Sequence, residues 1–183
     1  MLRAMAGALD RLAAEGTALL AVAADAATAA AAVRAGAALV DLGDAGSPAI
    51  AAFRANHPGI LVCAAGQTAD ITADPVLALR TGAILACADP VATGRARVPA
   101  GQLLVRVEPA RLAAARAAGY ATLVDLRDEP GPDAGTLAIA AISAWLGATV
   151  VRTAHPRQTR RAVDMASSIR GIRPPARTVR GLG

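Results

Sequence analysis

The stretch that decides the fold is residues 117–126, AAGYATLVDL, where an Ala-rich segment meets a glycine and then a run of β-type residues. The same order recurs in residues 34–42 (RAGAALVDL), 80–88 (RTGAILACA) and 145–153 (WLGATVVRT). Each copy predicts a helix that ends at a glycine and is followed at once by a buried strand. A chain that alternates helix and strand in this way predicts an α/β protein with a parallel sheet.

Working outward from these copies, we expect seven strands, at residues 18–23, 38–42, 60–65, 83–88, 103–107, 121–126 and 149–153. Helices are expected at residues 26–35, 48–55, 75–80, 109–118, 135–146 and 156–169, with Ser47 as the N-cap of the second and Asp74 of the third. The regularity favours a (β/α) barrel over an open doubly wound sheet. However, 183 residues are few for a barrel, which rarely has under about 200.

The missing part is expected between residues 88 and 103, which show no helical period. We therefore predict an incomplete TIM-barrel-like (β/α) fold, with about seven parallel strands and outer helices, shortened between strands four and five. Residues 1–171 are expected to form a single domain, and residues 172–183 a basic C-terminal tail.

The composition excludes several classes of protein. The chain is 55% hydrophobic, which excludes disorder, and its only thiols, Cys63 and Cys87, lie in apolar runs, which excludes a disulfide scaffold. We interpret both as buried thiols of a reducing compartment and expect the protein in the cytoplasm. All 19 basic residues are arginine, so a lysine Schiff base or a lysine-dependent phosphate loop is excluded.

The charge is unevenly distributed: residues 152–183 hold eight arginines and one acid. A basic segment is typical of nucleic-acid binding, but one Phe, one Tyr and one Trp offer almost nothing for base stacking. Nucleic acid is therefore not the expected partner. Residues 134–151 are uncharged, but Gly147 indicates a helix end followed by a strand, so we expect no membrane segment.

Candidate site residues come from the ends of the strands, because parallel α/β proteins form their sites there. Asp41, Glu108 and Asp125 are charged in otherwise apolar surroundings. Such carboxylates either pair with arginines as structural partners, or converge on one mouth and bind the edge of a heterocycle through paired hydrogen bonds.

Arg152 is the strongest anion-binding candidate, because the helix predicted to start at Pro156 would add free N–H groups and a positive dipole end. The alternative is an arginine that pairs with Asp125 or Asp128. His57 and His155 are far apart in sequence, and no residues have zinc-ligand or nucleophile spacing. We therefore predict no catalytic set and no metal site.

Residues 142–183, ISAWLGATVVRTAHPRQTRRAVDMASSIRGIRPPARTVRGLG, resemble the C-terminal end of bacterial dihydropteroate synthases, especially a divergent, actinobacterial-type paralogue. Residues 34–43 and 80–89 resemble the second- and fourth-strand regions of that family. The resemblance implies a (β/α)8 barrel, usually dimeric. It also implies an enzyme that condenses a pterin pyrophosphate with p-aminobenzoate in folate synthesis, where Mg²⁺ assists the loss of pyrophosphate.

Four positions match the family's site, as the resemblance implies. Asp41 corresponds to the strand-two aspartate, and Glu108 with Pro109 to an Asp-Pro that contacts the pterin. Arg127 falls near the catalytic lysine, and Arg152 matches the phosphate-binding arginine. These positions imply a pterin or pyrophosphate pocket built from Asp41, Glu108, Arg127 and Arg152.

Other family positions have lost their functional groups. The catalytic loop after the first strand is absent, and Cys63-Ala64-Ala65 replaces Val-Asp-Thr in the third strand. Cys87 and Ala88 replace an asparagine and an aspartate, and Ala154 replaces a histidine. His155 is displaced by one residue, which turns it to the other face of a strand.

These losses predict a pseudoenzyme, since one such group can contribute about 3 kcal/mol of transition-state stabilisation. We expect it either to bind a pterin or pyrophosphate ligand weakly, without a cofactor of its own and with Mg²⁺ only if pyrophosphate is bound, or to act as an interaction protein. In the second case its last helices would pair with another copy or with a full-length synthase. An active synthase of folate biosynthesis is the alternative, and a gene product without a defined role is a further possibility.

Overall fold

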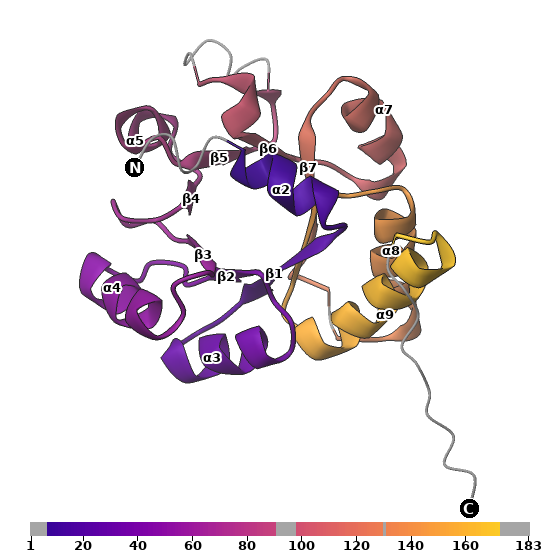
Figure 1. Ribbon diagram of the computed structural model, residues 1–183, viewed down its shortest axis with the longest axis horizontal. Helices are drawn as coiled ribbons and strands as arrows, with labels where there is room; N and C mark the ends of the chain where they lie inside the picture. The colour runs from indigo at the N-terminus through magenta and orange to yellow at the C-terminus, as the bar shows by residue number, and fades with distance from the viewer. Residues whose placement is uncertain (1–6, 91–97, 130, 173–183) are drawn as a thin grey trace, which may run out of the picture.

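The computed structural model describes residues 7–90, 98–129 and 131–172. Eight parallel strands close into a barrel in sequence order, and β1 pairs with both β2 and β8. The predicted α/β barrel class is therefore confirmed, and Figure 1 shows the helices around the outside of the ring. The strands are β1 (Ala18–Val22), β2 (Leu39–Asp41), β3 (Leu61–Cys63), β4 (Ile71–Thr72), β5 (Ile84–Cys87), β6 (Leu103–Arg106), β7 (Ala121–Leu126) and β8 (Val150–Thr153).

The structure has eight strands where about seven were predicted, and the barrel that was predicted to be incomplete is closed. The missed strand, β4, is only two residues long and lies in a polar segment without a β-type run. It pairs with β3 through Cys63 and Ile71 and with β5 through Ile71 and Ile84. The backbone ladder therefore closes across the position where the sequence gives no strand pattern.

The connection from β3 to β4 is the shortest crossover, since residues 64–70 join these two parallel strands without a helix. Parallel neighbours ordinarily need about a dozen connecting residues. Here the connection is possible because the register places Ile71, the first residue of β4, beside Cys63, the last residue of β3. The predicted shortening between residues 88 and 103 falls partly on residues 91–97, which lie outside the described residues.

The helices of the described residues surround the barrel, except that α2 lies across its N-terminal opening (Figure 1). They are α2 (Ala8–Ala14), α3 (Ala26–Arg34), α4 (Ser47–Asn56), α5 (Pro75–Thr81), α7 (Leu112–Ala117), α8 (Ala134–Trp145) and α9 (Pro156–Ile169), with short 3-10 turns η1 (Ala100–Gln102) and η2 (Pro109–Arg111). No helix in these ranges is long and apolar enough to cross a membrane.

Side-chain caps explain where several helices begin. Asp25 caps α3 and Asp133 caps α8, and the backbone N–H groups of Thr28 and Thr136 lower the pKa of these carboxyls by hydrogen bonding. Asp74 caps α5 as predicted. The predicted N-cap at Ser47 was wrong, because α4 already includes Ser47 and follows Gly46 in extended conformation.

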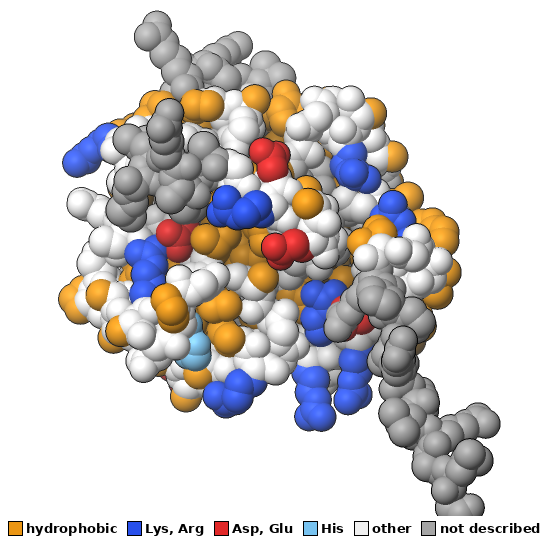
Figure 2. Space-filling model, viewed as in Figure 1, with side chains coloured by type: hydrophobic (Ala, Val, Ile, Leu, Met, Phe, Trp, Pro, Cys, Tyr) orange, Lys and Arg blue, Asp and Glu red, His pale blue; other side chains and the backbone are white. Residues whose placement is uncertain are grey.

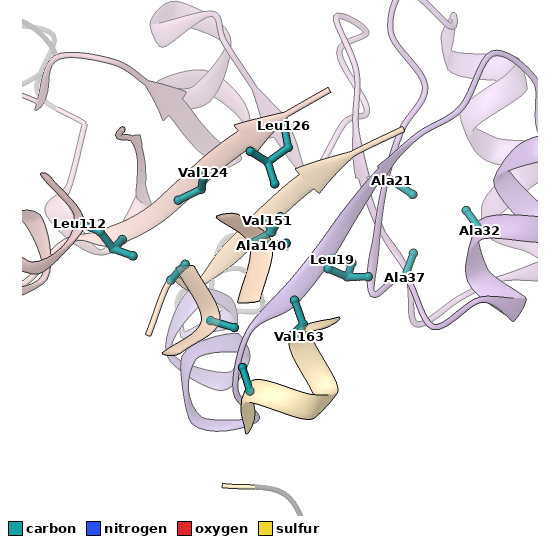
Figure 3. Close-up of a cluster of buried hydrophobic side chains, with 13 residues drawn as sticks. Leu19, Ala21, Ala32, Ala37, Leu112, Val124, Leu126, Ala140, Val151 and Val163 are labelled. Atoms are coloured by element: carbon teal, nitrogen blue, oxygen red, sulfur yellow. The ribbon is translucent and has the colours of Figure 1, made fainter. Parts of the chain in front are cut away.

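The core forms two layers because successive strand residues point to opposite sides of the barrel. The interior is filled by alternate strand residues such as Leu20, Leu39, Ile84 and Leu104, which α2 covers with Leu9. The intervening residues point outward beneath the helices. In Figure 3, Val124 and Val151 from the strands face side chains from α8 and α9 such as Ala140 and Val163.

Candidate functional site

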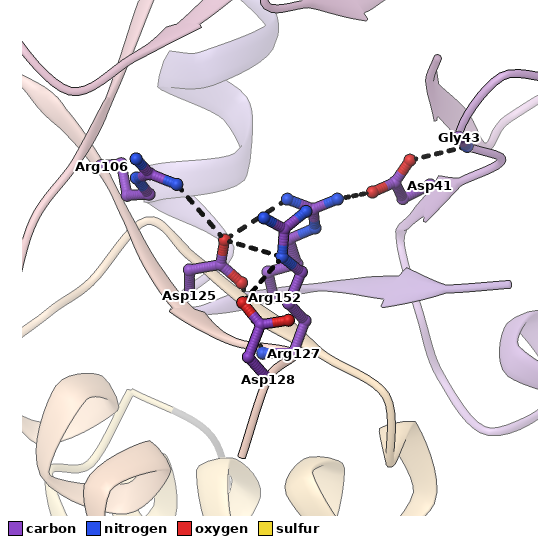
Figure 4. A network of polar contacts seen from close by, with 7 residues as sticks. All are labelled: Asp41, Gly43, Arg106, Asp125, Arg127, Asp128 and Arg152. Carbon is purple, nitrogen blue, oxygen red and sulfur yellow. Dashed lines mark hydrogen bonds and ion pairs between the residues drawn. The ribbon is translucent and has the colours of Figure 1, made fainter. Parts of the chain in front are cut away.

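The candidate site lies at the C-terminal mouth of the barrel, one inward-facing position beyond the apolar interior. Leu39 and Leu104 fill the interior, and two residues further along the same strands stand Asp41 and Arg106. In β7 and β8 the same step from Leu123 and Val150 gives Asp125 and Arg152. Figure 4 shows the side chains of these four charged residues close together. The two-residue period of the strands therefore turns an apolar core into a charged mouth.

Arg152 is at the centre of this mouth. Its guanidinium forms an ion pair with Asp41 and a second one with Asp125, where Nη1 lies 3.3 Å from Oδ2. The second oxygen of Asp41 accepts the backbone N–H of Gly43 at 2.9 Å, which orients the carboxylate (Figure 4). Two strands that are distant in sequence, β2 and β7, are thus connected through one arginine of β8.

Asp125 also forms ion pairs with two other arginines. Arg127 Nε lies 3.6 Å from its Oδ2, and Arg106 Nη1 lies 3.9 Å from the same oxygen. Arg127 also contacts the exposed carboxylate of Asp128 at 3.2 Å. Three guanidinium groups therefore share one largely buried carboxylate, whose side chain is only 11% exposed.

These residues enclose a cavity of about 370 Å³. Its wall combines the charged residues with small or thiol side chains, including Cys63 and Cys87. Burial raises the pKa of the Cys63 thiol to about 11, while nearby Arg127 opposes the shift and Asp125 adds to it. The thiol is therefore protonated at neutral pH and is not a nucleophile.

One donor at the mouth is unused. Nε of Arg152 is buried and has no hydrogen-bond partner among the described residues, and burial lowers the pKa of this guanidinium from its usual range. An arginine remains charged despite such a shift, so Arg152 can still donate to an anion that displaces one of its carboxylates.

The structure brings together three of the four predicted site residues. Asp41, Arg127 and Arg152 line the same cavity, whereas Glu108 does not. Glu108 is exposed, precedes η2, and lines a separate cavity of about 280 Å³ beside the mouth. It lies beyond the end of β6, so the strand no longer turns it inward.

Of the two predictions made for Arg152, the structure shows the pairing with a carboxylate, while anion binding stays a prediction. Arg152 binds Asp125, as one interpretation expected, and also Asp41. Asp128 binds Arg127 instead. Sequence reasoning missed Arg106, although its place two residues after the buried Leu104 is the same pattern that marks the other mouth residues.

The arrangement is poorly suited to catalysis. Its arginines and carboxylates neutralise one another, and the cavity wall contains no histidine among the described residues. His155, which the sequence placed near the family's phosphate-binding histidine, precedes α9 and is not part of this wall. Because Asp41 and Asp125 both bind arginine, these carboxylates do not fit a resident Mg²⁺ site.

The fold is that of the dihydropteroate synthases. The structure superposes on Yersinia pestis dihydropteroate synthase with a TM-score of 0.67, 14% identity, and coverage of 85% of this chain and 93% of the other. The Xanthomonas albilineans dihydropteroate synthase, solved with 4-aminobenzoic acid, superposes with a TM-score of 0.71 and 11% identity. The match covers 87% of this chain and 95% of the other. Rv1207 of Mycobacterium tuberculosis gives a TM-score of 0.69 with 22% identity over 88% of this chain and 95% of that one.

The sequence comparisons identify a narrower group over a short stretch. Proteins named inactive dihydropteroate synthase 2 are 52% identical over 48 residues in Mycobacterium bovis and Mycobacterium tuberculosis, and 50% identical in Mycobacterium leprae. This match covers 26% of the chain and spans about 15% of the M. bovis relative's length. No protein-family model matches the chain. The resemblance predicted from the sequence is therefore confirmed: the chain is a divergent, dihydropteroate synthase-like protein.

Proposed function

We propose that the protein is a non-catalytic dihydropteroate synthase-like protein that associates with a second copy of itself. The loss of catalytic groups supports the first part of the proposal, since the mouth retains paired charges in place of an acid, a base or a free phosphate-binding set. The relatives that match over 48 residues are themselves named inactive.

The observation that carries the association is an exposed apolar surface on the last two helices, which we call the α8–α9 face. Its six members are Ile142, Trp145, Leu146, Met165, Ile169 and Ile172, which are between 37% and 67% exposed. Helix α8 contains no charged residue along its whole length. Figure 1 shows α8 and α9 side by side on the outside of the barrel, and Figure 2 shows hydrophobic side chains at that edge.

A second copy suits this face because an uncharged apolar surface is complementary to itself across a two-fold axis. Together the six side chains expose several hundred Å², which approaches the ~800 Å² that each partner buries in an interface of standard size. Isolated apolar residues on a surface are ordinary, but six of them on or just after two adjacent helices, including the chain's single Trp, favour an interaction site.

The test replaces Trp145 or Ile169 with Glu and measures molar mass by light scattering. We expect the unmodified protein to be a dimer and each variant a monomer, because a buried unpaired carboxylate costs several kcal/mol at an interface. Val76→Glu on α5 is the matched control, since Val76 is 63% exposed and Ile169 67%. A monomeric unmodified protein contradicts the proposal, and capture of a full-length synthase by such a monomer would establish the other predicted partner.

A second candidate function is weak binding of a pterin or pyrophosphate ligand at the mouth. The cavity of about 370 Å³ favours it, as does the buried Nε of Arg152, which has no partner in the part of the chain that the structure describes. At 100 times its dissociation constant such a ligand would stabilise the fold by about 2.7 kcal/mol, which raises the melting midpoint by several degrees.

Thermal-shift titration with dihydropterin pyrophosphate tests this candidate, with pyrophosphate and Mg²⁺ alone as controls. We expect a rise that Arg152→Gln removes and Arg157→Gln, on the exposed start of α9, retains. An unchanged midpoint with every ligand excludes binding. Release of pyrophosphate in the presence of p-aminobenzoate would instead establish the alternative of an active synthase.

A further inference from the structure

A third cavity opens at the opposite end of the barrel, on the N-terminal face. It measures about 270 Å³ and lies where α2 meets the C-terminal ends of α7, α8 and α9. Its wall includes Asp10, Arg116, Tyr120, Gly147, Ser167 and Arg170. None of these residues takes part in the charged network of the mouth.

Two arginines from different helices converge on this cavity. Arg116, on α7, donates from Nη1 to the carbonyl oxygen of Leu146 at 3.1 Å, and Arg170, after α9, donates from Nη1 to the carbonyl oxygen of Ala144 at 3.1 Å. Both therefore bind carbonyl groups at the C-terminal end of α8, and the Ala144 carbonyl also accepts the backbone N–H of Gly147. One end of each guanidinium is fixed in this way.

Gly147 makes the position of Arg116 possible. Its φ of +83° is in the left-handed region that favours glycine, and a Cβ atom there would overlap Nη1 of Arg116. The guanidinium thus lies directly against the turn that connects α8 to β8. Arg116 is an exposed residue, and this contact with the turn, together with its hydrogen bond to Leu146, holds its guanidinium at the cavity wall.

In the mouth the arginines are paired with carboxylates, whereas among the described residues of this cavity they are not. Within the described ranges, neither Arg116 nor Arg170 forms an ion pair with a carboxylate, and Asp10 is the single acid on the cavity wall. A guanidinium has five N–H donors, so each arginine keeps donors beyond the one that binds α8. By contrast, Arg160 in the neighbouring cavity is paired with Asp164 at 2.5 Å.

We propose that this cavity binds the phosphate group of a small molecule between Arg116 and Arg170, with Tyr120 and Ser167 also on its wall. The planar fork of arginine matches the oxygens of a phosphate, and the two guanidiniums also offset the negative C-terminal ends of the helices that meet at this cavity. The cavity lies just below the usual ~300–1,000 Å³ of ligand pockets, which favours a small phosphate monoester over a nucleotide. This inference does not depend on the proposed function.

The test is calorimetric titration of the full chain with inorganic phosphate, using chloride at matched ionic strength as the control. We expect weak binding to the unmodified protein, and a loss of affinity of about tenfold or more in Arg116→Gln and in Arg170→Gln. Arg157→Gln should leave the affinity unchanged. Absence of phosphate binding, or equal affinity in all three variants, would overturn the proposal.

Two further variants keep the result interpretable. Arg152→Gln removes the candidate anion donor at the mouth, so retained phosphate binding supports the N-terminal cavity, and complete loss of binding overturns the proposal in favour of the mouth. Ser167→Asp places a carboxylate on the cavity wall without removing either arginine. It should abolish phosphate binding, and binding at the unmodified affinity would contradict the proposed position.

Discussion

At the scale of single residues, Asp125 determines how the mouth is organised. Its carboxylate lies within 4.0 Å of guanidinium groups of Arg106, Arg127 and Arg152. An arginine at a strand end is commonly a ligand-binding group, but a shared, buried carboxylate makes these arginines structural partners first. Any anion that enters the mouth must compete with Asp125.

We predict that Asp125→Asn lowers the free energy of unfolding by about 1–3 kcal/mol, because it leaves partly buried guanidinium groups without their shared carboxylate. Urea unfolding measures the change. Asp128→Asn is the control, since that side chain is 88% exposed and should shift stability by no more than about 0.5 kcal/mol. Equal effects of the two substitutions would show that the network does not stabilise the fold.

Cys63 gives a prediction of pH dependence. Its thiol pKa rises from an ordinary 9.0 to about 11 in the folded protein. The unfolded state therefore ionises first as the pH rises, so the contribution of this thiol is fully present below about pH 9 and is lost between about pH 9 and 11.

We expect alkylation of Cys63 to be slow at neutral pH and to accelerate only toward pH 11, as peptide mapping after iodoacetamide treatment would show. In the Cys63→Ala variant, the free energy of unfolding should no longer show the decrease between pH 9 and 11 that ionisation of this thiol causes. Rapid labelling of Cys63 at pH 7 would mean that the mouth is open to solvent at this position.

At the scale of elements, the short β3–β4 connection depends on Asp70. Its carboxylate accepts the backbone N–H of Val62 at 2.9 Å and binds Arg54 of α4 at 2.6 Å. Its backbone carbonyl accepts the N–H of Ile84 at 2.8 Å. One residue therefore connects β3, β5 and an outer helix beside the two-residue strand β4.

We predict that Asp70→Asn costs about 1–3 kcal/mol of stability and speeds amide exchange at Val62, whose acceptor is the Asp70 carboxylate. Amide hydrogen exchange followed by NMR measures both effects. Asp44→Asn, at an exposed loop position, should leave the exchange at Val62 unchanged. If Val62 exchanges no faster in the Asp70 variant, the backbone ladder alone holds β4.

At the scale of the whole molecule, the barrel class could be predicted because glycine-ended helices precede strands at regular intervals. The closure of the barrel could not be predicted, because Ile71 and Thr72 have no pattern of their own and form a strand only between β3 and β5. The candidate site could likewise be predicted only in part. Arg152 and Asp41 stand inside recognisable strands, whereas the exposed position of Glu108 depends on where β6 ends.

The pairing of β1 with β8 also has a consequence for how the protein is made. Ala18 of β1 pairs with Val150 of β8. One edge of β1 therefore has no partner strand until nearly the whole barrel has been synthesised. At the usual rate of elongation this interval is on the order of ten seconds, during which the backbone groups along one edge of β1 have no strand partner. A nascent chain in this state is a substrate for holding chaperones, and slower translation would lengthen its exposure to aggregation.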